Sequence, residues 1–307
     1  MKKNLITLLI FTLVFSCKNK ENKKLDSIIK TEFIEIIKDD YILNKPVKDA
    51  KAVLVLFGGF PENAGDIKRE FKIIENAEEN NIAVLYLNYS RKIWLTKKEK
   101  TLLSEQLQNI FKENKLPSDN VYIGGFSSGG NMALLISNFI THENSSIIPK
   151  GVFIVDSPLD LYALHTVAKK NVERNFSEPA VQESMWLIET LEKQLGKPEE
   201  DISKYEEYSV ATLKTGNIDN IKNLKETKIR FYTEPDTLWW KKNRFSEYDE
   251  MNAYYIKKLH ERLSELKFNA VEYIPTENKG YRANGERHPH SWSIVDKTDL
   301  VHWMLNK

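Results

Sequence analysis

Residues 121–135 read Val-Tyr-Ile-Gly-Gly-Phe-Ser-Ser-Gly-Gly-Asn-Met-Ala-Leu-Leu. The apolar run 121–123 predicts a buried strand, and the apolar run 132–140 predicts a helix. Between these runs lie four of the chain's twelve glycines, which permit a tight turn. The turn contains the pattern Gly-x-Ser-x-Gly at 125–129, which holds a serine hydroxyl exposed on a strained strand-to-helix turn. Ser127 is therefore the candidate nucleophile.

A glycine-rich turn between a strand and a helix has a second interpretation, because such turns also bind phosphate groups. Both uses depend on the amino end of the helix, where free N–H groups and the positive end of the dipole favour negative charge. The serine interpretation also requires a base and an acid in later loops, since an unassisted hydroxyl is a weak nucleophile. The rest of the chain decides between them.

The composition is that of a globular protein with little net charge. Hydrophobic residues make up 41% of the 307 residues and aromatic residues 11%, enough for one large α/β domain or two small ones. Lysine plus arginine number 45 and aspartate plus glutamate 44, so the charge gives no reason to expect a nucleic-acid partner. The single cysteine, Cys17, excludes a disulfide framework and a cysteine-based zinc site within one chain. The oligomeric state is left open.

The amino terminus has the features of a bacterial secretion signal. Two lysines follow the first methionine, and residues 5–15 form an apolar run too short to span a bilayer. Ser16 and Cys17 end a segment that resembles a lipobox. We therefore expect a signal peptide at 1–16, lipid on Cys17 and a polar tether at 17–30, which would anchor the protein to a membrane of the cell envelope, facing the periplasm or the surface. An ordinary signal peptide with a chance cysteine is the alternative.

Apolar runs of strand length alternate with amphipathic segments along the chain. The predicted strands are 33–37 and 41–43, which form an opening hairpin, then 52–57, 82–87, 121–123, 152–155, 229–233 and 270–274. The predicted helices outside the insertion described next are 66–80, 98–115, 132–140, 251–266 and 296–305. This alternation predicts an α/β fold with a doubly wound, mostly parallel sheet.

The alternation is interrupted before the penultimate strand. Helical runs at 161–172 and 180–195 follow one another without a strand between them. A connection this long is unusual unless it has a function of its own, such as a lid over the carboxyl edge of the sheet. We therefore divide the chain into a first part of the core at 31–157, a helical cap at 158–226 and a second part of the core at 227–307.

The base is expected in the loop before the last helix. Of the six histidines, four lie in or at the end of predicted helices, where a surface or packing role is the simpler interpretation. His288 and His290 lie after the last strand, where a loop returns side chains to the carboxyl edge. His290 is preferred, because His288 precedes a proline and is biased toward an extended conformation.

The acid should follow a strand and precede the histidine. Asp236, three residues beyond the strand 229–233, has this position, with Glu234 as a second choice. Asp156, at the end of the strand before the insertion, is a third possibility. A lone carboxylate after a strand is more often a helix cap or turn former, so the assignment to Asp236 depends on the order of the residues along the chain.

The oxyanion of an acyl-transfer reaction requires two backbone donors. The Ser128 N–H, directly after the nucleophile, is one candidate. The second is expected from the Gly58-Gly59-Phe60 turn that follows the strand 52–57, with Gly59 and Phe60 as the candidates. A plain tight turn is the alternative for these two glycines.

The order Ser127, Asp236, His290 resembles that of the α/β-hydrolase superfamily. The turn 58–60 resembles the oxyanion loop of that family, although most members have histidine at the position of Phe57, and the similarity covers 51–307. The Gly-Phe-Ser-Ser-Gly-Gly-Asn-Met-Ala stretch looks most like esterases, and the helical insertion resembles their cap domain. The resemblance implies a serine hydrolase acting on a small-molecule ester, with no metal or organic cofactor.

The sequence therefore predicts a carboxylic-ester hydrolase of the cell envelope. A peptidase or an acyltransferase with the same triad is an alternative, and so is a catalytically silent ligand-binding lipoprotein. Four further side chains near the predicted triad, Trp239, Trp240, Arg282 and Arg287, are expected to bind substrate. Together with Tyr281 they could stack on a sugar ring and bind a carboxylate, whereas the simpler interpretation is that the tryptophans pack and the arginines are solvated.

Overall fold

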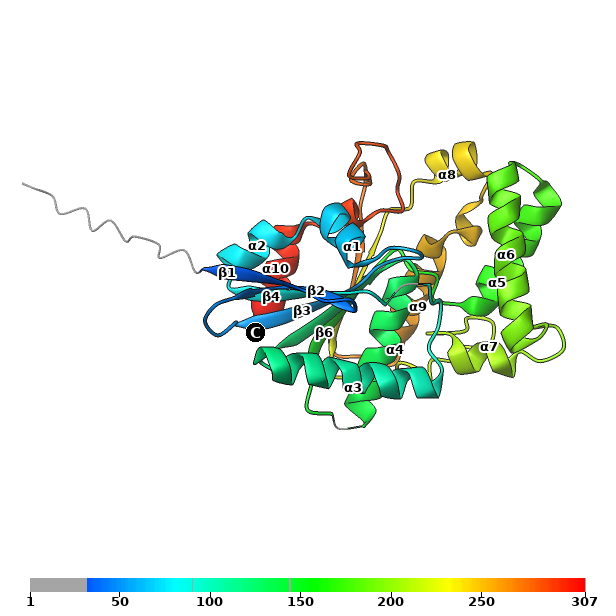
Figure 1. Cartoon of the computed structure of the whole chain (residues 1–307). Coiled ribbons are helices and arrows are strands. Elements are labelled where there is room, and N and C mark those ends of the chain that lie inside the picture. The colour runs from blue at the N-terminus through cyan, green and yellow to red at the C-terminus, as the bar shows by residue number, and fades with distance from the viewer. Residues whose placement is uncertain (1–31, 90, 144, 307) are drawn as a thin grey trace, which may run out of the picture. The chain divides into compact units, whose positions relative to one another are not determined.

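The computed structural model describes residues 32–89, 91–143 and 145–306 (Figure 1). Its sheet has the strand order β1-β2-β4-β3-β5-β6-β7-β8. The strands are β1 (Phe33–Ile37), β2 (Tyr41–Pro46), β3 (Ala52–Phe57), β4 (Ile82–Leu87), β5 (Val121–Phe126), β6 (Pro149–Val155), β7 (Lys228–Thr233) and β8 (Val271–Pro275). β1 and β2 form the expected antiparallel hairpin, β2 runs antiparallel to β4, and all later pairs are parallel. The predicted mostly parallel α/β sheet is confirmed.

Helices cover both faces of this sheet (Figure 1). On one face lie α3 (Lys97–Asn114), α4 (Ser128–His142) and α9 (Asn252–Glu265), and on the other lie α1 (Ala64–Phe71), α2 (Ile74–Glu79) and α10 (Lys297–Leu305). Successive residues of β3 alternate between the two cores, with Val53 and Val55 in the first and Leu54 and Leu56 in the second. Because both faces are covered, β3 and β4 are buried along their whole length.

Two predicted helices differ from those observed. The helix expected at 66–80 is two helices, because Lys72 adopts a left-handed conformation (φ 52°) that ends α1 before α2 begins. The helix expected from residue 132 starts at Ser128, so it includes Gly129 and Gly130. A Cβ at Gly129 would lie 2.3 Å from the Phe57 carbonyl oxygen, and only glycine permits this approach of helix to strand.

The segment between β6 and β7 is helical, as expected. It contains α5 (Leu161–Arg174), α6 (Glu178–Leu195), α7 (Ser203–Tyr208) and the short 3₁₀ helix η1 (Lys222–Leu224), and α5 to α7 stand together at one end of the molecule (Figure 1). Asp160 fixes the start of α5, since its carboxylate accepts hydrogen bonds from the N–H groups of Ala163 (3.0 Å) and Leu213 (2.8 Å). Residues 31–307, insertion included, form one compact unit.

Candidate active site

Ser127 lies at the junction of β5 and α4 in a backbone conformation that non-glycine residues rarely adopt (φ 52°, ψ −129°). Its N–H donates to the Val155 carbonyl oxygen at 2.9 Å, which ties the turn to the end of β6. A Cβ at Gly125 would lie 2.1 Å from the Gly129 oxygen, so the turn closes only with glycine there. The structure thus has the strand, strained turn and helix that the pattern Gly-x-Ser-x-Gly requires.

His290 lies against Asp156. Its Nδ1 is 2.6 Å from Asp156 Oδ2, and the other carboxylate oxygen of Asp156 accepts a hydrogen bond of 2.6 Å from Thr233 Oγ1. The Asp156 side chain is 5% exposed, and its carbonyl oxygen accepts from Asn252 Nδ2 at 2.9 Å. A short bond from Nδ1 to a fixed carboxylate selects one imidazole tautomer and leaves Nε2 as the proton acceptor.

Asp236, the acid preferred from the sequence, does not lie against His290. One of its oxygens accepts from the Trp239 N–H (2.9 Å) and caps an additional helix, α8 (Thr237–Arg244), and the other lies 2.6 Å from Arg287 Nη2. These contacts show that Asp236 was the wrong choice for the partner of His290. The carboxylate at that place is Asp156, which the sequence offered as a third possibility. The physical reason is sheet order: β6 neighbours β5, whereas β7 is one strand further from Ser127.

The two histidines of the last loop occupy different surroundings. The His290 ring packs against Phe126, the residue before Ser127, with ring centroids 4.5 Å apart. The His288 ring packs against Trp239 at 4.6 Å and is 6% exposed. Burial lowers the pKa of His288 to about 3, so this imidazole stays neutral. Since His290 alone meets both the nucleophile turn and a carboxylate, the geometry supports the preference for it.

The glycine turn after β3 lies beside the nucleophile. A Cβ at Gly59 would lie 2.9 Å from the Ser127 Cβ. The Gly59 N–H, however, donates to Glu62 Oε2 at 2.9 Å, so Gly59 is not the free donor that the sequence predicts. The candidates that remain are the N–H of Phe60 and the N–H of Ser128, the first residue of α4. Glu62 was missed from the sequence, where nothing distinguishes it from other carboxylates in a loop.

Solved structures with a similar fold cover most of this chain. Fungal esterases from Rhizomucor miehei give a TM-score of 0.54 at 12% identity, over 89% of this chain and 82% of theirs. Carboxyl esterase 2 from Tuber melanosporum gives 0.50 at 17% identity over 89% and 86%. S-formylglutathione hydrolase from Staphylococcus aureus gives 0.50 at 12% over 90% and 99%. The chain has the α/β-hydrolase fold.

Sequence comparison adds nothing to this likeness, because no family model and no curated protein matches the chain. At identities below 20%, similarity of structure shows the fold alone. The reaction of this protein must therefore be inferred from its own side chains.

The side chains expected to bind substrate are largely engaged within the protein. Arg287 lies between two carboxylates, with Nη2 2.5 Å from Glu234 Oε1 and 2.6 Å from Asp236 Oδ2, and Nη1 donates to the Gly280 carbonyl oxygen at 2.8 Å. Trp239 and Trp240 pack on His288. These contacts correct the expectation that Arg287 binds substrate, because its guanidinium is already paired within the protein. They also favour a packing role for Trp239 and Trp240.

Two predicted residues of the same loop are exposed. Arg282 lies on the surface, and Tyr281 is 45% exposed, with its ring 5.5 Å from the Arg287 guanidinium carbon. Among the residues that the structure describes, neither side chain makes a hydrogen bond that would hold it away from a ligand.

The helical insertion of this α/β-hydrolase fold reaches the glycine turn after β3. The Trp186 ring of α6 lies 4.8 Å from the Phe60 ring, and both side chains are over one third exposed. Beyond Trp186, a groove of about 100 Å³ runs between α6 and the loop before α3. Asn131, in the first turn of α4, anchors this loop by donating to the Ile93 carbonyl oxygen at 3.1 Å. The insertion therefore contacts Phe60, the residue whose N–H is one of the proposed oxyanion donors.

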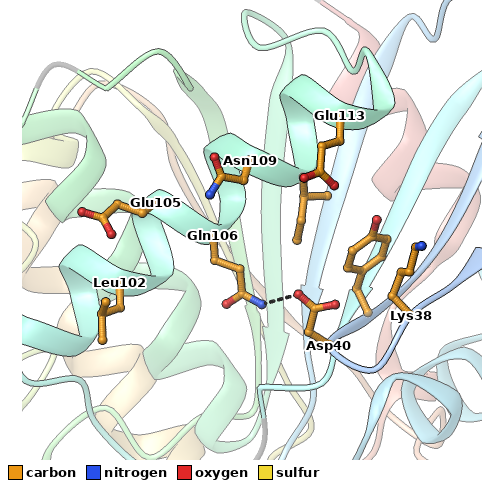
Figure 2. Close-up of a pocket in the computed structure, with 9 residues that line it drawn as sticks. Lys38, Asp40, Leu102, Glu105, Gln106, Asn109 and Glu113 are labelled. Atoms are coloured by element: carbon orange, nitrogen blue, oxygen red, sulfur yellow. Dashed lines mark hydrogen bonds between the residues drawn. The ribbon is translucent and has the colours of Figure 1, made fainter.

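A larger hollow lies elsewhere on the molecule. A cavity of about 440 Å³ lies between helix α3 and the turn that joins β1 to β2. Gln106 donates to Asp40 across it (Figure 2). It is lined by Lys38, Asp40, Tyr41, Leu102, Glu105, Gln106, Asn109, Ile110 and Glu113. None of these residues belongs to the loops at the carboxyl edge of the parallel strands, so the cavity is separate from the candidate active site.

Within the described ranges, no three His, Cys, Asp or Glu side chains are grouped as a metal site would require. The same part of the chain contains no helix of the length and apolar character needed to span a bilayer. The predicted signal peptide, tether and Cys17 lie outside the described residues.

Proposed function

We propose that this protein is a serine hydrolase that cleaves a carboxylic ester through an acyl-enzyme. The observation that carries the proposal is the Asp156–His290 pair, whose imidazole packs on Phe126, directly before a serine held in a strained turn at the start of a helix. Esterases and an S-formylglutathione hydrolase with the same fold support an ester or thioester as the bond attacked.

Each group has a definite role in the proposed reaction. Ser127 Oγ attacks the acyl carbonyl while His290 Nε2 takes its proton, and the C–O bond to the leaving group breaks as His290 returns that proton to it. Asp156 holds the imidazole and stabilises its charged form. The N–H groups of Ser128 and Phe60 stabilise the oxyanion. Water then attacks the acyl-enzyme through the same histidine and releases the carboxylic acid.

The test is the Ser127→Ala variant. It should unfold at the wild-type temperature yet lose several orders of magnitude in kcat on short p-nitrophenyl esters, since members of a triad act as a unit. Wild type should bind a fluorophosphonate probe covalently and Ser127→Ala should not. Full turnover by Ser127→Ala would overturn the mechanism, and failure of wild type to label would favour a catalytically silent binding protein.

The same assays separate the alternative reactions. A peptidase would cleave amides of the same acyl group at rates comparable with esters, and an acyltransferase would give ester products when an alcohol is added. Hydrolysis of esters far in excess of both is the expected result.

We further propose an envelope location through lipid on Cys17. This rests on the apolar run and the Ser16-Cys17 pair of the sequence. Stable anchoring needs more than one acyl chain, as bacterial lipoproteins have. Cys17→Ser should release the protein from the membrane fraction or block its processing. A wild-type protein that fractionates as soluble without detergent would contradict the proposal.

A further inference from the structure

Glu62 holds the turn after β3 at two points. Its carboxylate oxygen Oε2 accepts from the Gly59 N–H at 2.9 Å, and its own N–H donates to the Gly59 carbonyl oxygen at 2.6 Å. Both polar groups of one glycine are thus bonded to one residue.

The second bond determines the direction of the Phe60 N–H. The Gly59 carbonyl and the Phe60 N–H belong to the same peptide group, and in a planar trans peptide they point in opposite directions. Because the carbonyl points at Glu62, the Phe60 N–H points away from Glu62. Gly59 itself is pressed against Ser127, where a Cβ would lie 2.9 Å from the serine Cβ. The preceding Gly58 is pressed against Glu62, where a Cβ added at Gly58 would lie 2.7 Å from the Glu62 Cβ.

Glu62 also connects this turn to the segment that carries His290. Trp292 Nε1 donates to Glu62 Oε2 at 3.1 Å. The Trp292 ring packs on Phe126 at 5.5 Å, and Phe126 packs on the His290 ring. One carboxylate oxygen therefore joins the oxyanion turn, the residue before the nucleophile and the histidine loop.

Holding a carboxylate at this place is costly. Burial raises the pKa of Glu62, and the nearby carboxylates of Glu70 and Asp66 raise it further, while the two hydrogen bonds oppose the rise. Because the pKa of Glu62 is raised in the folded state, the contribution of its protonated form to the stability of the fold is present at low pH. This contribution is lost as pH rises through the folded-state pKa, so ionised Glu62 weakens the fold at neutral pH. A side chain kept at a cost to stability suggests a role in activity.

We propose that Glu62 is a positioning residue that fixes the oxyanion turn and aims the Phe60 N–H at the substrate oxygen. This inference rests on the proposed function. It also explains how the turn is supported in a chain that has Phe57 in place of the histidine common in related enzymes.

The experiment compares Glu62→Ala, Glu62→Asp and Glu62→Gln with wild type. Glu62→Ala removes the acceptor, and Glu62→Asp withdraws it while keeping the charge, so kcat should fall about 10- to 100-fold in both while KM changes less than about 3-fold. Glu62→Gln keeps an acceptor without charge and should stay within about 5-fold of wild-type kcat. Its thermal midpoint at pH 7 should equal or exceed that of wild type, because a partly buried charge is removed.

The rate of labelling of Ser127 by a fluorophosphonate, whose phosphoryl oxygen needs the same donors, should follow kcat across the series. The Trp292→Phe variant, which removes one donor to Glu62 and keeps an aromatic ring, is a matched control and should lose no more than a few-fold. Wild-type labelling rates in both Glu62→Ala and Glu62→Asp would overturn the inference alone. So would a loss in Glu62→Gln as large as in Glu62→Ala. A wild-type protein that does not label would overturn the proposed function and the inference with it.

Discussion

Asp156 and Asp236 each lie just beyond the carboxyl end of a parallel strand, but their carboxylates have different partners. Asp156 is buried between Thr233 and His290, with one short bond from each of its oxygens. Asp236 is a quarter exposed, caps α8 and shares Arg287 with Glu234. A position just after a strand therefore makes a carboxylate a candidate for the acid, whereas the partners brought by other loops decide its role.

The largest effect should come from Asp156. Asp156→Asn keeps the shape but favours the wrong His290 tautomer, so kcat should fall about 10³- to 10⁴-fold with little change in the unfolding midpoint. Ester hydrolysis and thermal melts measure both quantities. Asp236→Asn is the matched control and should stay within about 3-fold of wild-type kcat. The reverse ranking would return the acid to the loop after β7.

Arg287 tests whether the Asp236 loop is structural. Glu234 is fully buried and Arg287 is the cation beside it, so Arg287→Met should cost about 3 kcal/mol of unfolding free energy. Denaturant titration measures this cost. In the folded variant, KM for neutral short esters should be unchanged. A selective rise in KM for anionic esters, without loss of stability, would restore Arg287 to the substrate-binding role that the sequence suggested.

His288 should make the fold sensitive to acid. Its pKa is about 3 in the folded protein against 6.5 for the free side chain, so the unfolded chain takes up this proton first as pH falls. Stability should therefore decline below pH 6.5 and continue to decline toward pH 3. His288→Gln should reduce this decline, whereas His302→Gln, on the surface of α10, should not. Thermal midpoints at pH 7 and pH 5 give the comparison, and equal slopes in wild type and His288→Gln would contradict it.

The smallest effect should come from capping. Asp236 accepts the Trp239 N–H at the start of α8, and replacing such a cap by alanine costs about 1 kcal/mol. Asp236→Ala should lower unfolding free energy by this amount, plus part of the Arg287 contribution, with kcat nearly unchanged. A loss of activity greater than the loss of stability would show that α8 positions a group in the active site.

Much of the fold followed from local patterns in the sequence. The hairpin β1–β2 and the fully buried strands β3 and β4 were predicted because apolar runs of strand length are restricted to a few structures. The turn at Ser127 was predictable because only glycine permits so close a packing of backbone segments. A Cβ at Gly125 would lie 2.1 Å from the Gly129 oxygen, and a Cβ at Gly129 would lie 2.3 Å from the Phe57 oxygen. The break at Lys72 was not predictable, since the helical spacing continues across it.

Local sequence patterns were enough to locate the parts of the site formed by neighbouring residues: the turn around Ser127, the glycine turn after β3 and the loop that carries His290. The parts that depend on contacts between distant loops could be seen only in the folded chain. His290 lies against the carboxylate of Asp156, 134 residues away in the sequence, and the Gly59 N–H donates to Glu62. The reason is that a local pattern fixes backbone conformation, whereas a hydrogen-bond partner depends on strand order in space and on where each loop returns to the sheet.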